Sequence, residues 1–151
     1  MSAVSNLGTI NEAIAATIPD RDAIVFKDRR LSYGQLAERT RRLANFLLNQ
    51  GFGCHKERDA LSPWESGQDH VGLYLYNGNE YLEGMLGAFK SRTVPFNVNY
   101  RYVDEELAYL LNNARCQILL YHSSLAHRVE SVRDQIPSLK ILLQVNDDDS
   151  V

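Results

Sequence analysis

Cysteine is scarce in this sequence, and its scarcity excludes two kinds of stabilising site. Of 151 residues only two are cysteines, Cys54 and Cys116, and they lie far apart in unrelated contexts. Two such residues are too few and too scattered for a disulfide framework or a zinc site. Cys116 opens an apolar run and is expected to be a small buried side chain, whereas Cys54 lies in a polar loop and is expected to be exposed. A reduced, cytoplasmic setting fits this cysteine usage best.

Long apolar runs and basic clusters are missing as well. No stretch of about 18 apolar residues occurs, so we expect no membrane span. Residues 1–11 have neither a basic region nor an apolar core, so we expect no signal peptide. The formal net charge is -3, and no basic patch points to nucleic acid. Arg39, Arg41 and Arg42 fall within a helical pattern, and we interpret them as a solvated helix face rather than an anion or partner site.

Motifs that bind phosphate or activate a nucleophile are also absent. The sequence contains no G-x-x-x-x-G-K-[ST], no G-x-G-x-x-G and no G-x-S-x-G. Gly51-Phe52-Gly53 begins like a dinucleotide fingerprint, but it follows a predicted helix, whereas the fingerprint follows a strand. The sequence therefore points to no phosphate-binding loop of these kinds.

The histidines do not assemble a metal site in the sequence. They are His55, His70, His122 and His127, and no cysteine or carboxylate completes a ligand set with them. His122 follows a predicted strand, and α/β proteins bind ligands at the carboxyl ends of their strands. A functional role for His122 is therefore weighed against the simpler interpretation, a loop histidine.

The first part of the chain predicts a helix and a β-hairpin. Ile10, Ala13, Ile14 and Thr17 would share one face of a helix over residues 9–18. Beyond it, two short strands flank a polar turn, the pattern of a hairpin. The strands are predicted at residues 23–26 and 30–32.

A second helix, over residues 33–48, has the clearest signals in the sequence. Its apolar residues follow helical spacing. Ser32 and Gln35 have the spacing of a capping box at its start, and Gly51 is placed to end it.

Residues 52–70 have no periodicity and are predicted to form an irregular loop. A loop of this length in a compact domain is either functional or mobile. It contains Trp64, the only tryptophan of the chain. We favour Trp64 as an anchor of the loop onto the body over a lid or partner contact.

After this loop, strands and helices alternate, which is typical of βαβ units around a mostly parallel sheet. Asp104 is expected to cap one of the helices, and Ser123 or Ser124 another. Seven tyrosines from Tyr74 to Tyr121 form an aromatic theme, interpreted as packing with a ligand platform as the alternative. Residues 146–151 resemble a linker. The strands are predicted at residues 71–76, 94–98, 117–121 and 140–145, and the helices at 80–90, 104–113 and from about 123 to Pro137.

Several stretches together resemble the adenylate-forming enzymes. Residues 31–36 resemble the motif L-[TS]-Y-x-E-L, with Gln35 in place of the acidic residue. Residues 71–81 resemble a strand–turn–helix segment ending in N-x-x-E-Y. Residues 87–102 resemble GALKAGAVPVNVNYRY, with Arg92 where glycine is usual. Because a positive φ is unfavourable for arginine, we expect the local turn to differ there. The loop at 52–70 is longer than the resemblance predicts.

The order and spacing of these motifs, over residues 7–145, are similar to bacterial fatty-acyl-CoA synthetases, of an actinobacterial type. The resemblance implies that residues 1–151 form an N-terminal lobe of the adenylate-forming fold, with an α/β, mostly parallel sheet and a short N-terminal hairpin. It implies a full-length enzyme that uses ATP, Mg²⁺ and coenzyme A to activate a fatty acid or a sterol-side-chain carboxylate through an acyl-adenylate. The catalytic and cofactor-binding parts of the family lie further along the chain, so no catalytic, cofactor-binding or metal-binding residue is assigned here, and the segment alone is expected to be inactive.

The alternative is a self-contained α/β module that binds a nucleotide or a protein partner without catalysis.

Within the turn at residues 95–101, Arg101 could form a buried ion pair or contact an anion, and the structural role is favoured. A lobe separated from the rest of its enzyme would expose apolar surface. We therefore expect the isolated chain to self-associate.

Overall fold

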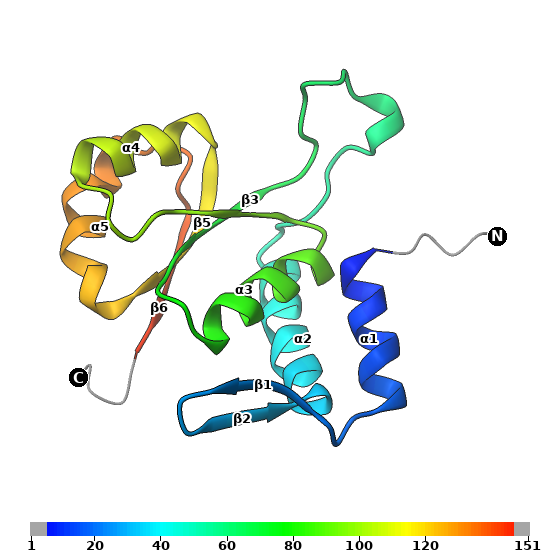
Figure 1. Ribbon diagram of the computed structural model, residues 1–151. Helices are drawn as coiled ribbons and strands as arrows, with labels where there is room; N and C mark the ends of the chain where they lie inside the picture. The colour runs from blue at the N-terminus through cyan, green and yellow to red at the C-terminus, as the bar shows by residue number, and fades with distance from the viewer. Residues whose placement is uncertain (1–5, 147–151) are drawn as a thin grey trace.

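The computed structural model describes residues 6–146 as three layers, with a parallel sheet between two groups of helices (Figure 1). The strand order in the sheet is β4-β3-β5-β6. All three neighbouring pairs are parallel, as the strand–helix alternation predicts. The strands are β3 (His70–Tyr74), β4 (Val94–Asn97), β5 (Cys116–His122) and β6 (Ile141–Val145).

Each face of the sheet is covered by its own pair of helices, so both faces are apolar. One buried cluster joins the sheet to α4 and α5, and a second joins it to α2 and α3. Helix α1 packs on α2 and α3 from outside (Figure 1). The helices are α1 (Leu7–Thr17), α2 (Tyr33–Asn49), α3 (Asn79–Lys90), α4 (Asp104–Asn113) and α5 (Ala126–Val132), with single turns η1 (Arg58–Ala60), η2 (Ser123–Leu125) and η3 (Arg133–Gln135).

The predicted hairpin and its following helix are confirmed. Strands β1 (Asp22–Phe26) and β2 (Arg29–Ser32) pair antiparallel. The Gln35 amide donates to Ser32 Oγ over 3.2 Å, and the Ser32 amide donates to Gln35 Oε1 over 2.9 Å, which completes the capping box. Gly51 ends the helix with φ 84°, a conformation that glycine adopts without strain.

Two predicted caps are wrong. Asp104 is the first residue of α4 rather than its cap, and the cap position is occupied by Val103, whose amide donates to Glu106. Ser123 and Ser124 lie inside η2, and the ring of His122 accepts the Ser124 amide instead. A histidine nitrogen replaces the expected serine oxygen because the strand continues to His122, one residue beyond the prediction for residues 117–121.

Helix α1 turns its apolar residues outward. Its buried residues are Gly8, Asn11 and Ala15, which are small enough to let α1 approach α3 closely. A Cβ atom on Gly8 would lie 3.2 Å from the Cα atom of Lys90. The shared face predicted for Ile10 and Ile14 exists, but it is exposed, and Leu7 extends it.

Candidate functional site

A cleft of about 500 Å³ lies where the strand order reverses. From β3 the chain adds β4 on one side of it. The chain then returns across the sheet and adds β5 and β6 on the other side of β3. The point at which the strand order reverses, the switch point, therefore lies between β3 and β5. Open α/β sheets bind ligands outside the carboxyl ends of their strands at such a point. The cleft is lined by Phe26, Lys27, Asp28, Arg29, Leu75, Tyr76, Asn77, Gly78, Asn79, Glu80, His122, Val145 and Asn146.

Aromatic rings form one wall of the cleft. The Tyr76 ring lies 4.9 Å from the Tyr100 ring and 4.9 Å from the His122 ring, centroid to centroid. Ser124 Oγ lies 2.8 Å from His122 Nδ1 and donates to the Tyr76 hydroxyl over 3.4 Å. The structure thus places His122 inside the cleft, where its predicted position at a strand end put it. Ligand binding by these rings, the alternative that the sequence left open, stays a prediction.

The opposite wall is built from the hairpin and the start of α3. Arg29 Nη1 donates to Glu80 Oε1 over 2.7 Å and to Asn79 Oδ1 over 3.2 Å. Gly78 lies beside the hairpin, since a Cβ atom on it would be 3.6 Å from the Phe26 ring. The hairpin therefore closes the cleft through an ion pair that sequence motifs did not indicate. In the sequence, the only indication of this ion pair was an arginine in a predicted turn.

Within residues 6–146, no cluster of histidine, cysteine, aspartate and glutamate side chains could hold a metal ion. Burial of the Tyr74 phenol raises its pKa, and its hydroxyl donates to the Tyr102 carbonyl at 3.2 Å. Burial raises the pKa of the Cys116 thiol to about 12. Both groups are therefore neutral packing residues, and Cys116 is the buried side chain that the sequence predicted.

The loop at residues 52–70, called the finger below, projects from the body (Figure 1). It is irregular, as predicted, but its tryptophan is not an anchor: Trp64 is 85% exposed. The preference for an anchor rested on the general tendency of tryptophan to be buried. The base of the finger is held by polar contacts instead, so it does not need the indole for attachment.

Arg92 corrects a second expectation. It adopts φ 60°, so arginine occupies the left-handed conformation that favours glycine, contrary to the expectation that the turn would differ there. Its guanidinium donates to both carboxylate oxygens of Glu57 over 2.8 and 2.7 Å, and its carbonyl accepts from Gln68 over 2.6 Å. Glu57 and Gln68 belong to the finger. The finger thus supplies contacts that offset the unfavourable φ of a non-glycine residue.

Arg101 is exposed, so the predicted buried ion pair is wrong. Its guanidinium carbon lies 5.5 Å from the Tyr100 ring centroid, and its amide donates to Asn99 Oδ1 over 3.0 Å. The alternative, contact with an anion, remains a prediction.

Arg39 and Arg41 pair with Glu83 and Glu12, and Arg42 pairs with Glu38, which fits the predicted solvated face.

The AMP-binding enzyme family model matches residues 11–151. The chain belongs to this family. Over 139 residues it is 50% identical to the medium-chain acyl-CoA ligase Mig of Mycobacterium avium, covering 92% of the chain and 25% of that protein. It is 35% identical to a medium/long-chain-fatty-acid–CoA/3-oxocholest-4-en-26-oate–CoA ligase of Mycobacterium marinum, covering 97% of the chain and 24% of that protein. The chain spans about a quarter of the length of these relatives.

Two solved structures share this fold. The anthranilate CoA ligase AuaEII superposes with a TM-score of 0.80 at 20% identity, over 96% of the chain and 26% of that structure. The N-terminal domain of FACL13 from Mycobacterium tuberculosis superposes with a TM-score of 0.79 at 22% identity, over 97% of the chain and 34% of that structure. The predicted adenylate-forming fold is therefore confirmed.

None of the helices among the described residues is long and apolar enough to cross a bilayer.

Proposed function

We propose that this chain is the N-terminal segment of an ATP-dependent acyl-CoA ligase that activates a fatty acid or a sterol-side-chain carboxylate. The observation that carries the proposal is the 50% identity to a medium-chain acyl-CoA ligase over 139 residues. The family match over residues 11–151 favours this function over the alternative, a binding module without catalysis. The second relative, whose name includes a cholestenoate, extends the candidate substrates to sterol side chains.

ATP, Mg²⁺ and coenzyme A belong to the full-length enzyme in this proposal. The described residues do not fit a magnesium–triphosphate group, because the two cations that line the cleft, Lys27 and Arg29, are balanced by Asp28 and Glu80, and Arg29 is paired with Glu80. A triphosphate needs several uncompensated donors and cations. We therefore assign no step of adenylation or thioester formation to these residues, and their role is to support the parts that perform it.

The outward face of α1 favours this structural role. Leu7, Ile10 and Ile14 are exposed at helical spacing and form an apolar stripe. Exposed apolar stripes of this kind mark surfaces that pack against another body. In the full-length enzyme we expect further chain to cover this stripe, and in the isolated chain we expect it to promote self-association in a cytoplasmic setting.

The proposal is tested by comparing the 151-residue chain with the product of its whole native gene. ATP–pyrophosphate exchange is measured with medium-chain and long-chain fatty acids and a cholestenoate. The full-length product is expected to exchange and the isolated chain to show none, because the segment has no phosphate loop. A native product of the 17.2 kDa mass of this chain, without exchange, would favour the binding module.

Replacing Arg101 with alanine in the full-length enzyme separates the two roles considered for it. Because Arg101 is exposed, we expect its removal to change the free energy of unfolding by less than about 0.5 kcal/mol. Loss of a charge-assisted contact with an anionic substrate would raise KM by about tenfold. Steady-state kinetics and urea unfolding are measured on the same preparation. Unchanged kinetics would exclude the anion contact.

A further inference from the structure

The turn between β3 and α3 contains the only Asn-Gly pair of the sequence, Asn77-Gly78. Gly78 is the residue before α3, and its backbone is extended, with φ -174° and ψ 179°. Its amide therefore lies outside the hydrogen-bond ladder of the helix. In the described part of the chain, neither the Gly78 amide nor the exposed side chain of Asn77 has a hydrogen-bond partner. No such contact holds the two groups apart.

An asparagine side chain and the backbone nitrogen of the next residue can react with each other. A bond between that nitrogen and the asparagine Cγ closes a small ring without strain. Because both groups belong to one chain, the reaction has the advantage of an intramolecular step over a bimolecular one. Glycine in the second position favours closure, because it has no Cβ atom to hinder the approach and its backbone rotates most freely.

We propose that Asn77 is a site of spontaneous covalent modification. The Gly78 nitrogen loses its proton to a solvent base and bonds to Asn77 Cγ, and the Cγ–Nδ2 bond breaks with release of ammonia. Water then adds to either carbonyl of the resulting succinimide, so the product is an aspartate or an isoaspartate. Water is the only co-reactant consumed, and no group is oxidised or reduced.

Asn79, two residues further along the same turn, is an internal comparison. Its side chain is buried, accepts from Arg29 Nη1 over 3.2 Å and donates to Glu83 Oε1 over 2.8 Å. These contacts hold the amide away from the backbone of the next residue, Glu80, whose side chain also hinders ring closure. We therefore expect Asn77 to react and Asn79 to stay intact, although both line the same cleft.

The modification changes the charge of the cleft. Among the lysine, arginine, aspartate and glutamate side chains that line it, Lys27 and Arg29 balance Asp28 and Glu80. The product at position 77 adds a carboxylate at the N-terminal end of α3, where the helix dipole favours a negative charge. An isoaspartate also lengthens the backbone before the helix. This inference does not depend on the proposed ligase activity. The reacting groups lie on adjacent residues, so no ligand or partner has to be assumed.

The test follows each asparagine in the folded chain over time. The 151-residue chain is incubated at physiological temperature and mildly alkaline pH, and its peptides are mapped by mass spectrometry. Conversion at Asn77 is expected to be about tenfold faster than at Asn79 or at Asn99, whose side chain accepts from the Arg101 amide. The rate should rise with pH, because the deprotonated amide is the nucleophile. Equal conversion of these asparagines, or none at Asn77, would overturn the proposal.

Gly78→Ala is the matched variant. Any residue can adopt the extended backbone at this position, and the added Cβ atom would lie 2.9 Å from Glu80 Oε2, the flexible end of a side chain. Conversion at Asn77 is expected to slow about tenfold. The same comparison in urea makes the test independent of folding, and Asn77→Asp supplies the charge standard for ion exchange. Conversion at the parent rate in Gly78→Ala would contradict ring closure through the Gly78 amide.

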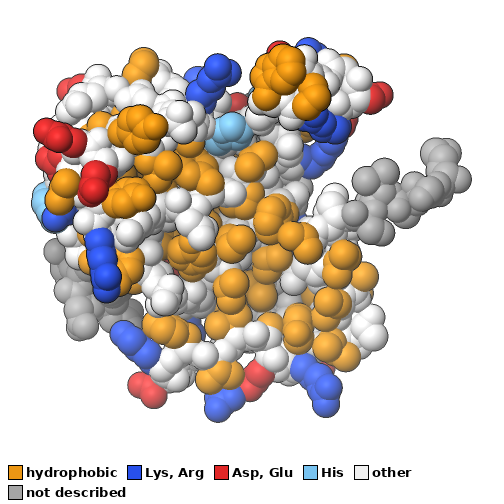
Figure 2. Space-filling view, turned by 45° about the horizontal axis from the view of Figure 1, so that its top comes forward, with side chains coloured by type: hydrophobic (Ala, Val, Ile, Leu, Met, Phe, Trp, Pro, Cys, Tyr) orange, Lys and Arg blue, Asp and Glu red, His pale blue; other side chains and the backbone are white. Residues whose placement is uncertain are grey.

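Self-association is separated from the reaction by varying the protein concentration. Hydrophobic side chains gather across the middle of the face shown in Figure 2, and they favour association as the concentration rises. Ring closure within one chain is a first-order process, so the fraction of Asn77 converted per unit time is expected to be the same at low and high concentration. A rate that rises with concentration would indicate attack by another molecule and would refute the intramolecular step.

Discussion

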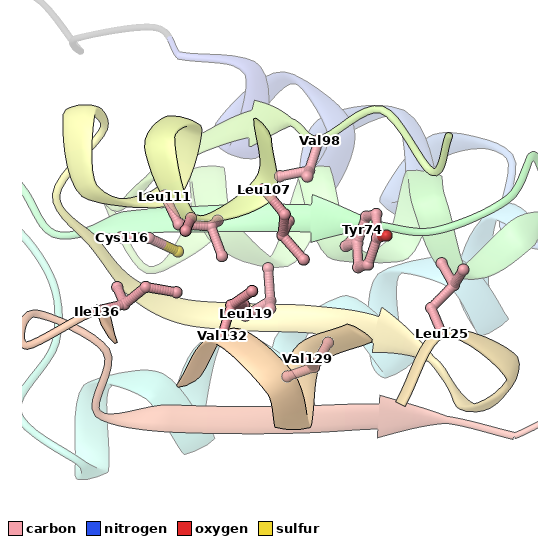
Figure 3. Close-up of a cluster of buried hydrophobic side chains, with 11 residues drawn as sticks. Tyr74, Val98, Leu107, Leu111, Cys116, Leu119, Leu125, Val129, Val132 and Ile136 are labelled. Atoms are coloured by element: carbon pink, nitrogen blue, oxygen red, sulfur yellow. The ribbon is translucent and has the colours of Figure 1, made fainter. Parts of the chain in front are cut away.

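Replacing Leu119 with alanine is expected to lower the free energy of unfolding by about 2–5 kcal/mol. Leu119 has no exposed surface, and β5 pairs on both sides, with β3 and β6. Its side chain belongs to the cluster that joins the sheet to α4 and α5 (Figure 3). Paired strands on both sides hold the backbone in place, so the site cannot collapse around the cavity, and the upper half of the range is expected.

Leu82→Ala is the matched control for this prediction. It makes the same chemical change on α3, where Leu82 is 46% exposed, so the expected loss is below about 1 kcal/mol. Both values come from urea unfolding, with the slope against denaturant compared as well. Similar losses in the two variants would show that the cluster around Leu119 is not the core of the domain.

Glu12→Gln is expected to destabilise the chain by about 2 kcal/mol, because it leaves a buried cation without its carboxylate. Lys90 is 7% exposed, and its ammonium lies 2.5 Å from Glu12 Oε1 and donates to Thr40 Oγ1 over 2.7 Å. This group joins α1, α2 and α3. The expected loss lies below the ~3–5 kcal/mol of a fully buried pair, because the Glu12 side chain is 36% exposed.

The stabilisation that Glu12 provides is expected to be lost at low pH. Burial raises the pKa of Glu12, but hydrogen bonds from Lys90 and Arg41 lower it by more, so the folded pKa lies below 4.5. The stabilisation is complete above pH 4.5, the ordinary pKa of the carboxyl group, and is lost as the pH falls through the lower pKa of the folded state. Unfolding free energies from about pH 7 to about pH 3 should therefore fall less steeply in Glu12→Gln than in the parent chain.

Lys90→Met separates the charge from the packing. Methionine keeps an unbranched apolar stem and leaves Glu12 near Arg41, at 3.0 Å, so the expected loss is below about 1 kcal/mol. The two variants should therefore differ in cost although they break the same ion pair. A Lys90→Met loss larger than that of Glu12→Gln would refute the assignment of Lys90 as the group that requires its partner.

Patterns that act over a few residues were readable from the sequence. The capping box of Ser32 and Gln35, the glycine stop at Gly51 and the alternation after residue 70 all appear in the structure. Each depends on local backbone chemistry, so neighbouring residues are enough to predict it.

Features that depend on distant partners were not readable in this way. The exposed stripe on α1 looked like any amphipathic face, and only the close approach of Gly8 to Lys90 shows which side is buried. The ion pair of Arg29 with Glu80 in the cleft joins residues 51 positions apart. Residues 147–151, most of the predicted linker, lie outside the described part of the chain. The exposure of Trp64 required the finger to be anchored by polar groups, which composition does not reveal.

The contact between Arg92 and the finger has a consequence for how this segment tolerates sequence change. Arginine at φ 60° is held by Glu57 and Gln68, so its acceptability depends on a loop more than twenty residues away. Shortening the finger would leave a strained arginine, whereas glycine at position 92 would release the strain with or without the finger. We therefore expect the effects of shortening the finger and of replacing Arg92 to be non-additive.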